Sequence, residues 1–179
     1  MNPIASLVAS SKELKRTRSL VQAAMLLAMQ VVLSAYASVY IDPSNKVSIG
    51  FIASAATGAL FGPFVAMVNG GLADLLQYAL QSPGVYNPGF TLNYMLTGMV
   101  FGLAFYRREI RPVHVIAARA IVVVIVNLGL GTLWITLQRG TGLPGFLAML
   151  PARATKALIQ LPFDMLLMLP LIDRIKKLG

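Results

Sequence analysis

The chain has no cysteine and few charged residues, and both absences limit what it can be. Without cysteine, disulfide bonds, thiolate nucleophiles and thiolate metal sites are excluded. Charged residues make up 12% of the 179 residues, against roughly 25% in an average soluble domain. So small a share cannot cover the surface of a water-soluble globule, and the mean hydropathy is +0.74. The composition excludes a soluble enzyme, a secreted domain and a disordered chain, and predicts one integral membrane bundle.

Signatures of several chemistries are also missing. The sequence has no G-x4-G-K-[ST] loop for binding ATP. Its single histidine, His114, is expected at the cytoplasmic edge, which excludes a histidine metal cluster and a histidine-based catalytic triad. We therefore expect no catalytic residue, no metal and no cofactor. Uphill movement of a solute would need an ion gradient or an energised partner.

Apolar runs separated by polar or Gly-Pro breaks predict an all-α membrane protein with six transmembrane helices. A helix needs about 20 apolar residues to cross a hydrocarbon core of about 30 Å. The first run has this length and exceeds the core of a signal peptide, although Ala35-Tyr36-Ala37 resembles a cleavage site. The Gly62-Pro63 pair divides the next stretch, because proline interrupts a helix. We expect a polar cytoplasmic segment at 1–18 and spans at about 20–39, 47–61, 63–81, 90–106, 112–137 and 146–172, within a membrane domain of residues 19–179.

Basic residues are distributed unequally between the two sides of this six-span arrangement. One side holds the 107–111 loop and both termini, and its ten basic residues are Lys12, Lys15, Arg16, Arg18, Arg107, Arg108, Arg111, Arg174, Lys176 and Lys177. The other side holds only Lys46 and Arg139. Because basic loops are retained in the cytoplasm, both termini are expected there. The net charge of +9 is thus a topology signal, and we expect no nucleic-acid binding.

Ionisable side chains inside the spans predict a polar pocket. Such groups are costly in a membrane unless they have a partner or a water-filled cavity. At about 1.5 Å per helical residue, Asp74, Arg153 and Lys156 share one level in the outer half. This predicts a pocket with two cations and one carboxylate that suits an anionic ligand. The alternative is a structural pair of Asp74 with either cation. Arg119 and Asp164, in the cytoplasmic half, are expected to form a structural ion pair.

Aromatic and amide residues are expected near the same outer level. Trp134, beside Thr132, could stack on a planar ligand, and the Asn93 amide could read donor and acceptor edges of a heterocycle. Tyr40, Lys46 and Tyr94 complete the set of candidate binding residues. An interfacial aromatic belt is the competing explanation for about half of the aromatic residues at this level.

Pairs of small residues one helical turn apart predict close helix packing. The glycine pairs Gly58-x3-Gly62 and Gly98-x3-Gly102 are expected to pack within the bundle. The pair Ala24-x3-Ala28 lies on the first span, which is peripheral by sequence order, so this stripe could contact a separate membrane partner.

Five stretches together resemble a substrate-binding (S) component of an energy-coupling factor (ECF) vitamin transporter, most closely the folate family. They are Ala24-x3-Ala28, FGPFVAMVNGGLADLL, GFTLNYMLTGMVFGL, Thr-Leu-Trp at 132–134 and LPARATKALIQLPFDMLL at 150–167. The third-span pattern is shared by many S components, whereas the later stretches point to folate. One position departs from the pattern, because Gly131 precedes Thr-Leu-Trp where asparagine is expected.

The resemblance implies a subunit of a prokaryotic plasma membrane that captures folate from outside and is not itself an enzyme. It implies docking, through Ala24 and Ala28, on a transmembrane coupling subunit powered by two cytoplasmic ATPases. Arg153, Lys156 and Lys46 would suit the folate carboxylates. Trp134 and nearby tyrosines would suit the ring, and Asp74 or Asn93 the pterin nitrogens. The alternatives are another vitamin (thiamine, pantothenate or riboflavin), a solitary ion-coupled transporter and a lipid-modifying enzyme, for which no catalytic group is visible.

Overall fold

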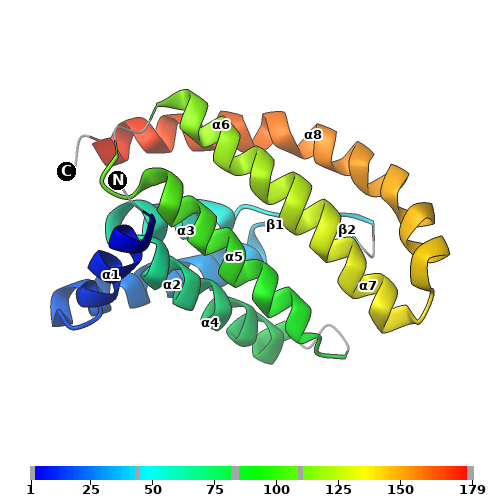
Figure 1. Ribbon diagram of the computed structural model, residues 1–179, viewed down its shortest axis with the longest axis horizontal. Helices are drawn as coiled ribbons and strands as arrows, with labels where there is room; N and C mark the ends of the chain where they lie inside the picture. Colours follow the sequence, from blue (N-terminus) through cyan, green and yellow to red (C-terminus); the bar gives the residue numbers. More distant parts are fainter. Residues whose placement is uncertain (1–2, 43–44, 82–84, 109–110, 177–179) are drawn as a thin grey trace.

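A computed structural model describes residues 3–42, 45–81, 85–108 and 111–176. They form a helical bundle with one short β-hairpin (Figure 1). The elements are α1 (Pro3–Glu13), α2 (Thr17–Tyr36), β1 (Ser38–Asp42), β2 (Asn45–Ser48), α3 (Phe51–Phe61), α4 (Pro63–Gln81), α5 (Pro88–Phe105), α6 (Pro112–Ile121), η1 (Val122–Leu130), α7 (Gly131–Arg139) and α8 (Gly142–Lys176). The helical class predicted from the sequence is confirmed, and the hairpin is an addition to it.

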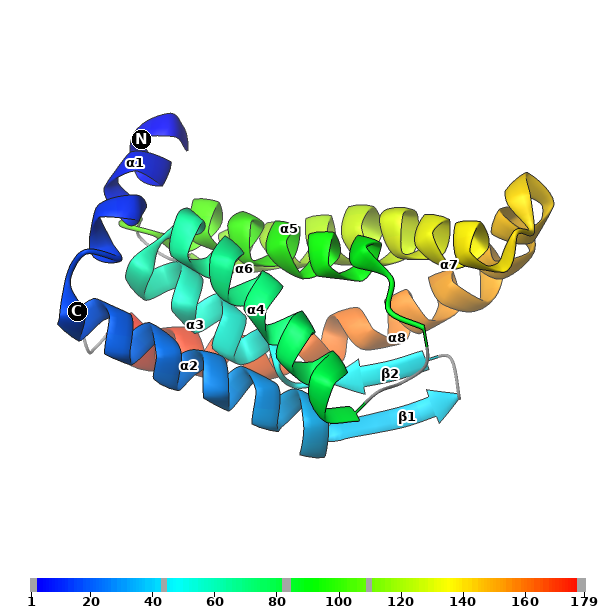
Figure 2. The ribbon, with the colours of Figure 1, turned by 90° about the horizontal axis from the view of Figure 1, so that it is seen from below.

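The helices form one connected bundle around α5. Helix α5 packs against α3, α4 and α6, and α2 crosses α3 and α4 (Figure 2). The segments α6, η1 and α7 follow one another without a break as one long helix, with a π-helical stretch in its middle, and α8 packs along it (Figure 1). An apolar cluster joins α3, α5, α6, η1 and α8 and includes the fully buried Phe101, Val115 and Met168.

Glycines allow α3, α4 and α5 to approach closely. A Cβ added to Gly58 would lie 2.7 Å from the backbone nitrogen of Gly102, and one added to Gly98 would overlap the carbonyl of Ala66. Any side chain at these positions would push the helices apart. The internal packing predicted for both glycine pairs is therefore confirmed.

The turn between α3 and α4 is as tight as the Gly62-Pro63 pair predicts. Gly62 has φ of 89°, a backbone conformation that favours glycine. The buried Ser10 of α1 holds this turn: its hydroxyl donates to the Phe61 carbonyl at 2.7 Å and accepts from the backbone nitrogens of Phe64 and Val65 at 3.1 and 3.2 Å. Part of the predicted polar segment 1–18 is thus a helix that caps the start of α4.

Several predicted span boundaries need correction. The second helix begins at Phe51 rather than near 47, because residues 45–48 pair with residues 38–42 in the hairpin. The last helix, α8, extends over Gly142–Lys176 rather than the predicted 146–172. Within the described residues, two helices, Thr17–Tyr36 and Pro112–Arg139, are long and apolar enough to cross a membrane by length and composition.

Candidate functional site

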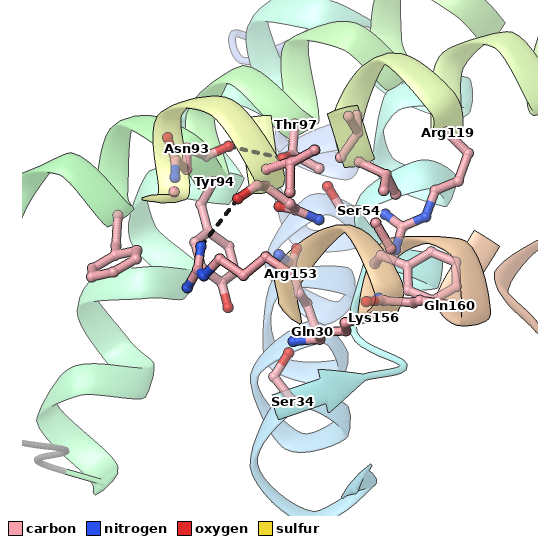
Figure 3. Close-up of a pocket in the computed structure, with 18 residues that line it drawn as sticks. Gln30, Ser34, Ser54, Asn93, Tyr94, Thr97, Arg119, Arg153, Lys156 and Gln160 are labelled. Carbon is pink, nitrogen blue, oxygen red and sulfur yellow. Dashed lines mark hydrogen bonds between the residues drawn. The ribbon is translucent and has the colours of Figure 1, made fainter. Parts of the chain in front are cut away.

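A cavity of about 240 Å³ opens between α2, α3, α5, the long α6–α7 helix and α8 (Figure 3). Its wall brings together residues that are up to 130 positions apart, from Gln30 on α2 to Gln160 on α8. Four of the predicted site residues line it, namely Asn93, Tyr94, Arg153 and Lys156.

The cavity wall carries three cations, Arg119, Arg153 and Lys156. No aspartate or glutamate is among the described residues that line it. Asp164 pairs with one of these cations: its carboxylate is fully buried and accepts from both Arg119 Nε, at 2.8 Å, and Arg119 Nη2. Asp164 compensates the charge of Arg119. Among the described residues no carboxylate is paired with Arg153, so an anionic group of a ligand would compensate that cation.

The Arg119–Asp164 ion pair confirms the structural pair expected from the sequence. Both side chains are almost completely buried, at 3% and 0% exposed. The Arg119 guanidinium also lies over the ring of Phe51, 4.2 Å from its centroid. Arg119 thus holds α6, α8 and the start of α3 together. It also forms part of the cavity wall, a second role that its sequence context did not indicate.

Arg153 is held at the cavity wall by neutral oxygen atoms. Its Nη1 donates to the carbonyl of Asn127 at 3.3 Å, the dashed line at Arg153 in Figure 3. It also donates to the hydroxyl of Thr132 at 3.3 Å. Thr132 is fully buried and lies behind Arg153, so the residue predicted to contact the ligand positions this cation instead. In the parts of the chain described, Arg153 has no acidic partner within ion-pair distance, so its charge remains available to an anion.

Asp74 lies outside this wall, and both predictions made for it need correction. Its carboxylate accepts a hydrogen bond from the Thr91 hydroxyl at 2.6 Å, across the α4–α5 contact. Within the described residues it forms no ion pair with Arg153 or Lys156. The common level of these residues in the membrane stays a prediction, and depth along a helix does not fix which way each side chain points.

Trp134 also supports the wall without being part of it. The indole Nε1 donates to Asn93 Oδ1 at 3.1 Å, and the ring packs on Gly89 so closely that a Cβ there would overlap ring atom Cδ2. The prediction that Trp134 stacks on the ligand changes accordingly: in this structure it orients the buried Asn93 amide, which lines the cavity.

The remaining predicted residues lie elsewhere. Tyr40 and Lys46 pair across the β-hairpin by their backbones, and their side chains lie outside the described residues. Ala24 and Ala28 lie on the exposed face of α2, away from the buried Ala23 and Gln30. This exposure leaves the alanine stripe accessible to another membrane protein.

Sequence reasoning missed several polar residues of the wall. Gln30 and Ser34 of α2, Ser54 of α3 and the amides of Asn127 and Gln160 all line the cavity. An amide in the middle of an apolar run indicates a polar site, because the amide needs a hydrogen-bonding partner just as an ionisable group does. Of the amides in this wall, the sequence analysis used only Asn93 in this way.

A family model and two relatives with similar sequences indicate the same protein family for this chain. A family model described as ECF transporter, substrate-specific component, matches residues 18–172. The chain is 29% identical over 127 residues to the folate transporter FolT of Clostridium novyi, covering 71% of this chain and 73% of the relative. It is 29% identical over 153 residues to the folate transporter FolT of Leuconostoc mesenteroides, covering 83% and 80%.

A solved structure of FolT bound with folic acid has a similar fold. The TM-score is 0.81 at 33% sequence identity, and the match covers 89% of this chain and 95% of that one. The family match begins at residue 18, so helix α1 precedes it. The resemblance found in the sequence motifs is confirmed: this chain belongs to the family of substrate-specific components of ECF transporters, which are membrane-embedded, substrate-binding transport subunits rather than enzymes.

Proposed function

We propose that this protein is the folate-binding S component of an ECF transporter and captures folate from the extracellular side. The observation that carries the proposal is the cavity wall, which has three cations and no carboxylate among its described residues. The two relatives named as folate transporters and the FolT structure containing folic acid support folate as the ligand.

The chemistry of folate matches this wall. Folate has a planar pterin ring and a glutamate tail with two carboxylates that are ionised at neutral pH. Asp164 already compensates Arg119, and the Arg153 cation, which has no acidic partner among the described residues, suits a carboxylate of this tail. Arg153 and Lys156 receive the tail through charge-assisted hydrogen bonds. The Asn93 amide and the Tyr94 side chain form a neutral part of the wall that suits the ring.

The protein spans the membrane six times, with both termini in the cytoplasm. The spans are α2, α3, α4, α5, the long α6–α7 helix and α8, and the charge distribution of the loops supports this orientation. In that arrangement Gln30 and Ser34 lie near the outer end of α2, and Phe90 and Asn93 near the outer end of α5. The cavity then opens toward the extracellular side.

Transport of the bound vitamin depends on partner proteins. The sequence has no ATP-binding loop, so a transmembrane coupling subunit and two cytoplasmic ATPases supply the energy. The exposed pair Ala24 and Ala28 on α2 is the contact surface for the coupling subunit, since small residues permit close approach of helices in lipid.

Fluorescence of the single tryptophan tests the ligand assignment. Trp134 is hydrogen-bonded to a residue of the cavity wall, so ligand binding should change its emission. We expect quenching by folic acid at low concentration and no response to thiamine, pantothenate or riboflavin. A response to one of those vitamins and none to folic acid would assign a different ligand.

A second measurement tests the alternative that the chain is a solitary transporter, which would move its solute without partner subunits. The purified chain alone, reconstituted in liposomes, should bind folic acid but not accumulate it, with or without a proton or sodium gradient. Accumulation without ATPase partners would contradict the coupled mechanism.

A further inference from the structure

Gln30 on α2 lines the cavity with an amide oxygen that has no partner. The side chain is 2% exposed, and Oε1 is buried without a hydrogen bond to any described residue. Three side-chain atoms are in this condition in the described parts of the chain, and the other two belong to Tyr106 and Asp164. Of the three residues only Gln30 belongs to the cavity wall (Figure 3).

Close packing fixes the position of Gln30. A Cβ added to Gly50, which precedes α3, would lie 3.0 Å from the Gln30 carbonyl and would overlap the Ser34 hydroxyl. The backbone of α2 is therefore held against the start of α3 at this point. The side chain has little room to leave the wall, but rotation about its last torsion exchanges the amide oxygen and nitrogen at low cost.

A buried glutamine whose amide oxygen is unpaired does not stabilise the ligand-free protein. A buried amide oxygen without a partner lowers stability, whereas an apolar side chain of similar size would leave nothing unsatisfied. The unpaired oxygen is therefore better explained by the occupied state, in which a ligand supplies the missing donor.

The rest of the wall shows which ligand group that is. Arginine and lysine side chains only donate hydrogen bonds, so the three cations cannot accept one from a ligand. The Asn93 oxygen already accepts from Trp134. A ligand that carries N–H groups beside its anionic tail needs an acceptor, and among the neutral side chains of the described wall Gln30 is the one with a buried oxygen that has no partner in the described residues. We propose that Gln30 is a ligand-recognition residue whose amide oxygen accepts a hydrogen bond from an N–H group of the bound vitamin.

This inference rests on the proposed folate-binding function, and a matched pair of variants tests it. Gln30→Met removes the amide and keeps the size of the side chain. Asn69→Leu is the control, because Asn69 is also buried, does not line the cavity and already donates to the Ala23 carbonyl at 2.9 Å. For each variant and the unmodified protein, the Kd for folic acid and the unfolding temperature of the empty protein are measured in the same detergent.

The two variants should behave in opposite ways. Gln30→Met should raise the Kd for folic acid roughly tenfold, with an unfolding temperature of the empty protein equal to or above that of the unmodified chain. Asn69→Leu should lower the unfolding temperature and leave the Kd within about twofold, because it removes a satisfied hydrogen bond away from the ligand.

Two results would overturn the role of Gln30. One is an unchanged Kd in Gln30→Met while the unmodified protein binds folic acid. The other is a Gln30→Met protein that fails to fold or unfolds at lower temperature when empty, which would make the glutamine a structural residue. If the unmodified protein does not bind folic acid at all, the proposed function fails first and this inference fails with it.

Discussion

The indole nitrogen of Trp134 donates a hydrogen bond to the amide oxygen of Asn93 at 3.1 Å, which links the one tryptophan of the chain to the wall of its cavity. The bond joins α7 to α5 and fixes which side of the Asn93 amide faces the cavity. Trp134→Phe removes the donor and keeps an aromatic ring on Gly89. We expect the affinity for folic acid to fall about threefold to tenfold, measured by calorimetry because the fluorophore is lost. An unchanged affinity would show that the orientation of Asn93 does not depend on this bond.

Arg153 should contribute more to binding than any neutral wall residue. Arg153→Ala removes a cation that is held by the Asn127 carbonyl and the Thr132 hydroxyl and has no acidic partner in the described chain. We expect a loss of affinity for folic acid of about 30- to 100-fold, since truncating one member of a hydrogen-bonded charge pair costs about 2–3 kcal/mol in a partly exposed site. Arg139→Ala, at an exposed position on α7, is the matched control and should bind normally. Equal behaviour of the two variants would argue against a ligand carboxylate at Arg153.

The Arg119–Asp164 pair should matter for stability. Asp164→Asn leaves the Arg119 charge buried without its carboxylate, and we expect the free energy of unfolding to fall by about 3–5 kcal/mol. The double variant Arg119→Met with Asp164→Leu removes both charges and should recover most of this loss. Thermal unfolding in detergent measures both effects. If the double variant is less stable than Asp164→Asn, the pair stabilises the fold beyond neutralising its own charges.

Gly131 is the position where the folate-family pattern suggests asparagine, and the structure explains how such a change could act. A Cβ built on Gly131 lies 3.4 Å from Arg153 Nη1 and 3.6 Å from Asn93 Nδ2, both ordinary contact distances. Gly131→Asn should therefore fold normally and alter the affinity for folates through these two neighbours. Comparing the Kd for folic acid and for a reduced folate in both proteins tests this. Unfolding of the variant would contradict the space seen at this position.

The alanine stripe of α2 should separate binding from transport. Ala28→Trp places a large side chain on the exposed face of the helix, away from the cavity. We expect normal affinity for folic acid in the purified subunit and loss of folate uptake by cells that contain the partner subunits, because the helix can no longer approach the coupling subunit. Leu20→Trp, at another exposed position on α2, is the control. Uptake that survives Ala28→Trp would place the docking surface elsewhere.

The sequence predicted the helices better than the contacts between their side chains. Hydropathy and the Gly62-Pro63 break were sufficient to place α4, α5 and the α3–α4 turn, since each depends on local features. The hairpin before α3 was missed, because residues 45–48 are short and continue directly into an apolar run. A long hydrophobic segment gives no local sign of where strand pairing ends and a helix begins.

In the site, the direction of a side chain could be predicted only in part. Arg153 and Lys156 are three residues apart on one helix, and both line the cavity. Asp74 faces Thr91 instead, because the rotation of α4 depends on glycine contacts with α5 that a sequence pattern does not specify. Gln30 was not predicted as a site residue, because the pocket was predicted mainly from ionisable side chains within the spans and an amide there is a weaker indication.

Calorimetric titration of folic acid into the purified, ligand-free protein tests the central proposal most directly. The cavity of Arg153 and Lys156 predicts saturable binding of one folic acid per chain that weakens strongly in Arg153→Ala. Absence of binding to the unmodified protein, or equal binding to both proteins, would contradict a cavity built to hold an anionic vitamin.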